Sequence, residues 1–257
     1  AYDQPYGILP TPTYTGYNFT GWYTSSGTKI ESTTIVKTLE DITLSARYEA
    51  KTFTLTFDPG SGSVSPLTKT ITYDQPYGVL PEPTYIGYNF LGWYDNAGTK
   101  IESTTIVKIT ENQTIHSRYE AKSFVVYFNP GYGTVSPESK SITYDQPYGE
   151  LPEPTYTGYD FIDWISEGGE VIKSTTIVKT LEDFTATASY SAKTFTLTLD
   201  PGSGSVSPSS MTITYDQPYG NLPDAERTGY YFLGWYTEDG DKIEGDMIVK
   251  VLEDITV

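Results

Sequence analysis

A chain of 257 residues with a net charge of −17, no cysteine and one histidine lacks the groups that several kinds of site require. It cannot form a disulfide framework or a cysteine/histidine zinc site, and its acidity disfavours nucleic acid, whose phosphates need a basic surface. No apolar run approaches the roughly 18 residues of a bilayer-spanning helix, so we expect no membrane insertion of this segment.

The chain is a tandem repeat. The hexapeptide Tyr-Asp-Gln-Pro-Tyr-Gly begins at four positions spaced 71 residues apart, namely Tyr2, Tyr73, Tyr144 and Tyr215. A constant period of this length indicates one small folding unit copied in series. We predict a partial first copy at 1–50 that lacks its first hairpin, complete copies at 51–121 and 122–192, and a copy at 193–257 that lacks most of its last strand. The incomplete end copies suggest a segment of a longer protein, so the missing signal peptide carries no weight.

The complete copy at 51–121 begins with a predicted hairpin. Phe53, Leu55 and Phe57 alternate with threonines, and a period of two is typical of a half-buried strand. A Pro- and Gly-containing turn follows at 58–62, and a second alternating run completes the hairpin.

A proline-rich segment comes next. Residues 75–83 include three prolines, which exclude a long helix and a central strand. We expect a crossover with at most one helical turn, whose apolar residues Leu80 and Tyr85 cover the sheet.

The tryptophan of each copy lies in the third predicted strand, which is 88–94 in the second copy. Gly92 suggests a β-bulge that turns Phe90 and Trp93 toward the same side. Both positions recur in every copy, and we predict that they form its structural core. The eight residues are Trp22, Trp93, Trp164, Trp235, Phe19, Phe90, Phe161 and Phe232.

Two further short strands complete the predicted copy, so the expected fold class is mainly β, or α+β at most. The joint Glu49-Ala50-Lys51 contains neither Gly nor Pro, and so short a polar link has little reach. We therefore expect a semi-rigid string of copies, on the order of 120–150 Å long if the four lie in line.

The motifs of the second copy resemble a known family. The runs Thr-Phe-Asp-Pro-Gly-Ser-Gly-Ser-Val-Ser-Pro, Tyr-Asp-Gln-Pro-Tyr-Gly-Val-Leu-Pro-Glu-Pro-Thr and Gly-Tyr-Asn-Phe-Leu-Gly-Trp-Tyr are similar to the Listeria–Bacteroides repeat, the B-repeat of internalin-type proteins. The resemblance covers nearly the whole chain and implies a tandem array of small β-grasp-like repeats in secreted and cell-surface proteins of bacteria and archaea. Tyr48, Tyr119 and Tyr190 replace a common Trp, a mild departure. The family supplies no catalytic residues.

Titratable residues recur without forming a recognisable catalytic pattern. Two carboxylate positions are repeated, at Asp3, Asp74, Asp145 and Asp216 and at Glu40, Glu111, Glu182 and Glu253. We expect the aspartates to cap the following turn through backbone N–H groups and the glutamates to mark the last hairpin. Weak calcium binding is an alternative, although no EF-hand spacing is present. His116 is expected to face solvent, and we predict no cofactor, metal or enzyme activity.

Lysines and tyrosines also recur in register. Lys37, Lys108, Lys179 and Lys250 are predicted to be exposed charges, because no asparagine recurs beside them to form an isopeptide bond. Tyr2, Tyr6, Tyr14, Tyr17 and their equivalents pack in turns and core, or else form an aromatic surface. Asn18 and Asn112 begin glycosylation sequons.

These observations favour a non-enzymatic extracellular array, a semi-rigid stalk or spacer of a cell-surface protein. Its partners would be the neighbouring repeats. One alternative is an adhesin module that binds a host surface protein or glycan through a tyrosine-rich face. Another is a subunit of an extracellular filament or sheath, in which like chains pack into a fibre.

Overall fold

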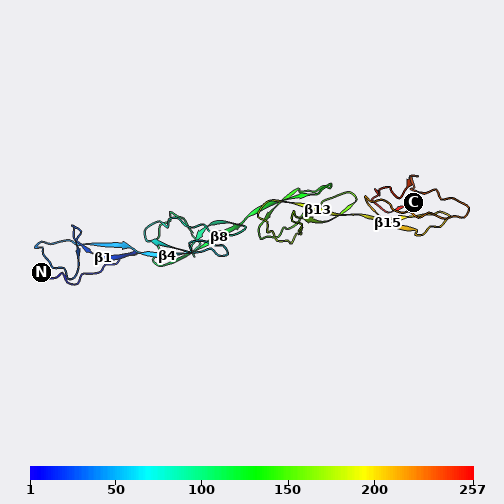
Figure 1. Ribbon diagram of the computed structural model, residues 1–257. Helices are drawn as coiled ribbons and strands as arrows, with labels where there is room; N and C mark the ends of the chain where they lie inside the picture. Colours follow the sequence, from blue (N-terminus) through cyan, green and yellow to red (C-terminus); the bar gives the residue numbers. More distant parts are fainter. The chain divides into compact units, whose positions relative to one another are not determined.

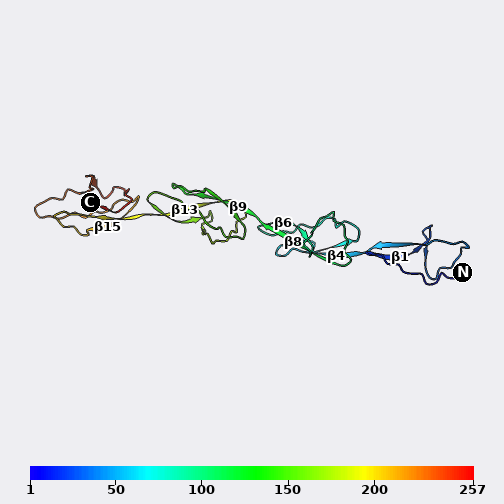
Figure 2. The same cartoon turned by 180° about the vertical axis from the view of Figure 1, so that it is seen from behind.

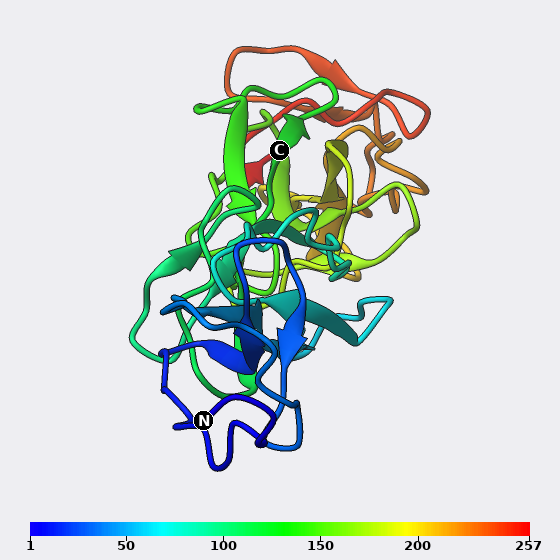
Figure 3. The same ribbon diagram turned by 90° about the vertical axis from the view of Figure 1, so that its left-hand side faces the viewer.

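The computed structural model describes residues 1–257 and consists of strands and loops (Figure 1). The fold class is mainly β, as predicted. The chain divides into two compact units, Ala1–Lys122 and Ser123–Val257. No helix of the length and apolar character needed to span a bilayer is present. Figure 3, a quarter turn from Figure 1, shows how much of both units is loop.

The first unit contains eight strands. They are β1 (Tyr17–Tyr23), β2 (Lys29–Ile30), β3 (Ser45–Ala50), β4 (Thr52–Asp58), β5 (Thr68–Thr72), β6 (Tyr88–Tyr94), β7 (Lys100–Ile101) and β8 (Gln113–Ala121). They form a three-stranded sheet of order β2-β1-β3 and a five-stranded sheet of order β5-β4-β8-β6-β7.

The second unit contains ten strands. They are β9 (Ser123–Asn129), β10 (Ser139–Thr143), β11 (Tyr159–Ile165), β12 (Val171–Ile172), β13 (Phe184–Ala192), β14 (Thr194–Thr198), β15 (Ser210–Thr214), β16 (Trp235–Tyr236), β17 (Lys242–Ile243) and β18 (Ile255–Thr256). Their sheets have the orders β10-β9-β13-β11-β12, β15-β14-β18 and β16-β17.

One long strand organises each five-stranded sheet. The first half of β8 pairs in parallel with β4, and the second half pairs antiparallel with β6, so that His116 is the partner of both Asp58 and Tyr94. Figure 2 shows β4, β6 and β8 together. β13 joins β9 and β11 in the same way.

Local sequence accounts for these strands. In β4, Leu55 and Phe57 are buried and the threonines lie on the other side, as their alternation predicted. The register shifts between Phe90 and Gly92, where Gly92 has a φ of 139°, so the predicted bulge is present. Phe90 consequently packs on the same cluster that contains Trp93. The third copy keeps the bulge with Asp163 at the glycine position.

The proline-rich crossover stays extended, and the helical turn that we allowed for does not form. It is fixed instead by an antiparallel bridge between Ser63 and Thr84 and by Trp93, whose indole N–H donates to the Pro81 carbonyl oxygen at 2.8 Å. Leu80 packs against the core, as expected. Because no helix crosses the sheet, the β-grasp-like outline stays a prediction.

The indole contact is present in all four copies. Each tryptophan donates at 2.8 Å to the carbonyl of the proline twelve residues earlier; the pairs are Trp22–Pro10, Trp93–Pro81, Trp164–Pro152 and Trp235–Pro223. A buried indole needs a partner for its N–H, and an extended crossover has carbonyl groups without a helical donor. One hydrogen bond therefore gives a partner to both the indole N–H and the proline carbonyl.

The predicted core residues differ in burial between copies. Trp93, Trp164 and Trp235 are 1–4% exposed, whereas Trp22 is only half-buried. The phenylalanines Phe90, Phe161 and Phe232 pack against the three buried clusters. In the second copy the Phe57 ring of the first hairpin lies 5.0 Å from Trp93, and the first copy has no such hairpin. The assignment of these residues as the core, like the predicted bounds of the copies, stays a prediction.

We predict that Trp93→Phe weakens the second copy more than Trp22→Phe weakens the first. Phenylalanine leaves the partly buried Pro81 carbonyl without its donor, at a cost of about 1–3 kcal/mol. Hydrogen exchange followed by mass spectrometry measures each copy separately, which a global unfolding curve of a repeat array does not. Equal loss of protection in both variants would contradict the assigned role of the indole bond.

Candidate functional site

The most distinctive arrangement of polar groups lies where one copy leads into the next. β3 ends at Ala50 and β4 begins at Thr52, so Lys51 alone separates them. The Lys51 N–H donates to the Gly16 carbonyl of the first copy, and the Lys51 carbonyl accepts from the Tyr73 N–H of the second, both at 2.9 Å. A single residue is thus bonded to both copies.

Aromatic side chains cover this joint. Tyr17 stacks on Tyr14 with ring centroids 4.5 Å apart, and it makes an edge-to-face contact with Tyr73 of the second copy, with centroids 5.5 Å apart. The Tyr73 ring lies so close to Gly16 that a Cβ there would overlap it, and Gly16 has a φ of 82°. The glycine therefore permits both the turn and the approach of the second copy.

The hydroxyl of Tyr17 donates to Asp74 Oδ2 at 2.8 Å, and Lys108 donates to the other carboxylate oxygen. We refer to Tyr17, Asp74 and Lys108 as the junction cluster. The ammonium group of Lys108 and then the Tyr17 hydroxyl hold the pKa of the Asp74 carboxyl below its usual value. The hydrogen bond to Asp74, with smaller effects of burial and charge, raises the pKa of Tyr17 to about 12.

The second unit repeats the arrangement. Lys193 joins β13 to β14, and Tyr159 donates to Asp216 at 3.1 Å while Lys250 binds the other oxygen. Burial, and then the bond to Asp216, raises the pKa of Tyr159. Tyr156 stacks on Tyr159 with centroids 4.3 Å apart. The junction cluster is therefore a property of the repeat.

The structure corrects the expected role of the repeated aspartates. Each has a positive φ of 62–65°, a conformation that Asp tolerates better than most residues, and its carboxylate binds a lysine of its own copy. The pairs are Asp3–Lys37, Asp74–Lys108, Asp145–Lys179 and Asp216–Lys250. The lysines are exposed, as expected, but paired. Their constant separation of 34 residues was the signal in the sequence.

A second repeated contact escaped the sequence analysis. The side-chain oxygens of Asn112, Asp183 and Asp254 accept the backbone N–H of Thr54, Val125 and Thr196 at 2.7–2.8 Å. Asn112 is a predicted glycosylation site, and it is exposed, as is Asn18 on β1. The glutamates Glu40, Glu111, Glu182 and Glu253 are exposed as well.

His116 is partly exposed and has both ring nitrogens engaged. Nδ1 lies 2.8 Å from Asp58 and Nε2 lies 2.9 Å from Asn96. The Gly60 N–H and then the His116 bond lower the pKa of Asp58. No hydroxyl nucleophile is among these ring contacts, so the arrangement ties the end of β4 to a turn and lacks the geometry of a catalytic triad.

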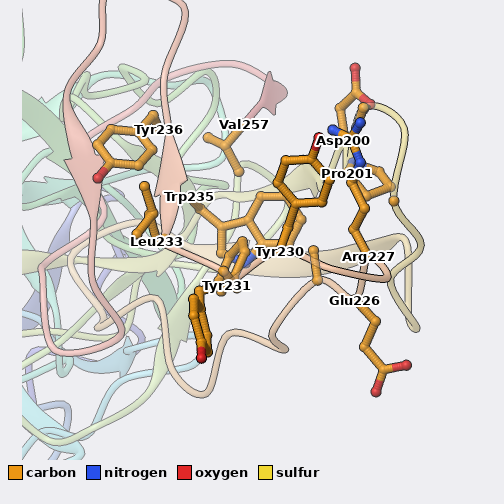
Figure 4. A pocket seen from close by; sticks show the side chains of 15 residues that line it. Asp200, Pro201, Glu226, Arg227, Tyr230, Tyr231, Leu233, Trp235, Tyr236 and Val257 are labelled. Carbon is orange, nitrogen blue, oxygen red and sulfur yellow. Dashed lines mark hydrogen bonds between the residues drawn. The ribbon is translucent and has the colours of Figure 1, made fainter.

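A pocket of about 390 Å³ opens in the fourth copy (Figure 4). Pro201 and Phe232 contribute to its lining. In the second copy the corresponding residues, Pro59 and Phe90, contact Tyr119 of β8, whose hydroxyl donates to the Pro59 carbonyl at 3.1 Å. The pocket therefore lies where the second half of β8 packs in a complete copy, and we assign it no catalytic role.

The repeat described above matches a known family model at residues 1–47, 53–118, 124–189 and 195–257, described as the Listeria-Bacteroides repeat domain. The chain belongs to this family. The family recognised from the sequence motifs is therefore confirmed. Each matched range contains one of the four hexapeptides, and the residues between the ranges are the joints between copies.

Three relatives share parts of the array. Internalin H of Listeria monocytogenes serovar 1/2a is 38% identical over 42% of this chain and 20% of its own length. Two proteins of Evansella cellulosilytica, whose names describe them as membrane proteins, are 27% and 25% identical over 77% and 94% of this chain. The chain spans only 20%, 30% and 29% of the length of these relatives.

We predict that Asp74→Asn lowers the pKa of Tyr17 from about 12 toward that of an ordinary tyrosine. The amide removes the negative charge that favours the protonated phenol. NMR titration of ring-labelled tyrosine measures the shift, with Asp3→Asn as a control because Asp3 belongs to the first copy and its carboxylate binds Lys37. An unchanged Tyr17 titration in Asp74→Asn would refute the junction bond.

Proposed function

We propose that this array is a non-enzymatic, extracellular stalk or spacer of a cell-surface protein. The observation that carries the proposal is the joint itself: the backbone of Lys51 is hydrogen-bonded to Gly16 on one side and Tyr73 on the other. A link of one residue, covered by aromatic rings and a charged hydrogen bond, restricts the angle between two copies. A spacer needs this stiffness to keep its length.

The family supports a surface location. Listeria-Bacteroides repeats match across the chain, and an internalin and two proteins named for the membrane share its sequence. A net charge of −17 suits a soluble array whose copies do not collapse onto one another.

The repeated tyrosines that an adhesin would use for binding make contacts within the array. Tyr14 and Tyr17 stack on each other, and Tyr17 is bonded to Asp74 of the next copy. Because these rings already contact one another and the next copy, the stalk role is favoured over an adhesin role in which the repeated tyrosines bind a host protein. Packing of like chains into a filament has no comparable observation in its favour.

Small-angle scattering and an inserted hinge test the proposal. We expect scattering from an elongated particle. We also expect insertion of Gly-Gly after Ala50 to broaden the distribution of distances between copies one and two, because the insertion separates Lys51 from Gly16. Spin labels at Ser25→Cys and Ala97→Cys report that distance, and the chain has no native cysteine to interfere. The same insertion in the exposed turn after Gly168, which lies away from both labels in the chain, is the control. A compact particle, or an unchanged distribution, would overturn the proposal.

We also predict that acid loosens the joint. The pKa of Asp74 is lowered in the fold, so its contribution to the junction is present above the unfolded value of 3.8 and is lost as the pH falls through the lower folded value. The same spin labels should show a broader distribution at about pH 2 than at about pH 6. Asp74→Asn should be equally broad at both, and a pH-independent wild-type distribution would count against the cluster.

A further inference from the structure

The third copy differs from the others at the tip of its first hairpin. Tyr132 stands where the second and fourth copies have Ser61 and Ser203, and it is 93% exposed. It is absent from the stacks that join the copies. The fold leaves this ring almost wholly exposed, so its face is available to a ligand.

The loop that presents Tyr132 is held firmly. Thr134 and Thr155 exchange two backbone hydrogen bonds of 2.8 Å, and Gly133 donates to the Pro130 carbonyl at 3.0 Å. A Cβ at Gly133 would collide with the Thr155 carbonyl, so the loop lies directly against the next segment. Tyr132 therefore projects from an ordered turn.

A groove of about 600 Å³ begins at this ring. Tyr156 lies beside Tyr132 with ring centroids 6.3 Å apart and planes inclined by 32°, so the two rings form one aromatic wall. Tyr156 is itself fixed by its stack on Tyr159, whose ring is parallel to within 1°. The volume is in the range of small-molecule sites, and its aromatic wall is already in place.

Polar groups of both signs line the rest of the groove. Glu153 and Asp160 are exposed carboxylates, and the ammonium group of Lys193 lies 3.6 Å from Asp160. Carboxylates accept hydrogen bonds and ammonium groups donate them, so hydroxyl groups find partners of both kinds here. The chain's net charge of −17 and the unpaired Glu153 carboxylate disfavour an anionic ligand.

We propose that this groove binds a neutral oligosaccharide, with a sugar ring stacked on Tyr132 and Tyr156 and its hydroxyls bonded to Glu153, Asp160 and Lys193. Sugars combine apolar C–H faces, which pack on aromatic rings, with a rim of hydroxyl groups. The groove offers both kinds of contact. The site goes beyond the spacer role, because only the third copy has the tyrosine, and either function can hold without the other.

The repeat supplies matched variants. Tyr132→Ser installs the residue of the second and fourth copies and leaves the turn compatible with the fold. Tyr127→Thr is the control: Tyr127 is also unique to the third copy and 48% exposed, it lies outside the groove, and the other copies have Thr56 and Thr198 there. Circular dichroism and scattering should be the same for both variants and the wild-type chain.

The experiment titrates the whole chain with neutral hexaoses of glucose (β1,4- and β1,3-linked), mannose, xylose and N-acetylglucosamine, and with a hexagalacturonate and a proline-rich peptide, by NMR and calorimetry. We expect saturable binding of at least one neutral hexaose, with shifts in the Tyr132, Tyr156 and Lys193 signals. Tyr132→Ser should weaken it about tenfold or more, and Tyr127→Thr should leave it unchanged. Asp160→Asn should weaken it less, because an amide still accepts a hydrogen bond.

Four results would overturn the proposal: no saturable binding of any neutral hexaose, equal binding by Tyr132→Ser, tighter binding of the hexagalacturonate, or capture of the peptide in preference to the sugars. None of them bears on the spacer role, because that role is tested at Lys51 and at the cluster of Tyr17, Asp74 and Lys108, none of which lines the groove. An elongated particle with rigid joints would remain.

Discussion

The hydrogen bond from a tryptophan indole to a proline carbonyl is the contact on which each copy depends. A crossover rich in proline cannot form a helix, so its carbonyl groups need donors from elsewhere. Trp93 supplies one to Pro81 and fills the space beneath it, packed on Phe57 of the first hairpin. Bulk and hydrogen bond come from the same side chain, which lets a short copy close its core without a helix, disulfide or metal.

The joint between the first two copies is connected to the core of the first through one strand. The bulge beside Gly21 fixes β1, the strand that carries both Trp22 and Tyr17, so the tryptophan inside one copy and the tyrosine that reaches the next belong to one rigid element. β3 pairs with β1 along its length and then continues through Lys51 into β4. Core, strand and joint are therefore continuous along the chain, with Trp22 and Tyr17 on the same strand.

The mainly β fold and the tandem repeat could be predicted from the sequence, because periodicity indicates both directly. The alternation in 53–57, the bulge at Gly92 and the direct passage between copies followed from local pattern. The helical turn in the crossover and the capping role of Asp74 were wrong, because both depend on partners distant in sequence: Pro81 is satisfied by Trp93, and Asp74 by Lys108 and by a tyrosine 57 residues earlier. Composition shows that such groups exist, but not which of them meet.

The repeat also separates two kinds of residue. A position that is the same in every copy, such as the Asp–Lys pair, serves what all copies share, which is folding and joining. A residue found in one copy alone is under no such constraint, and His116 and Tyr132 are of this kind. Both ring nitrogens of His116 are hydrogen-bonded, to Asp58 and Asn96, whereas Tyr132 has an open groove beside it. In an array whose repeated residues are committed to structure, a ligand site is therefore best sought where one copy departs from the others.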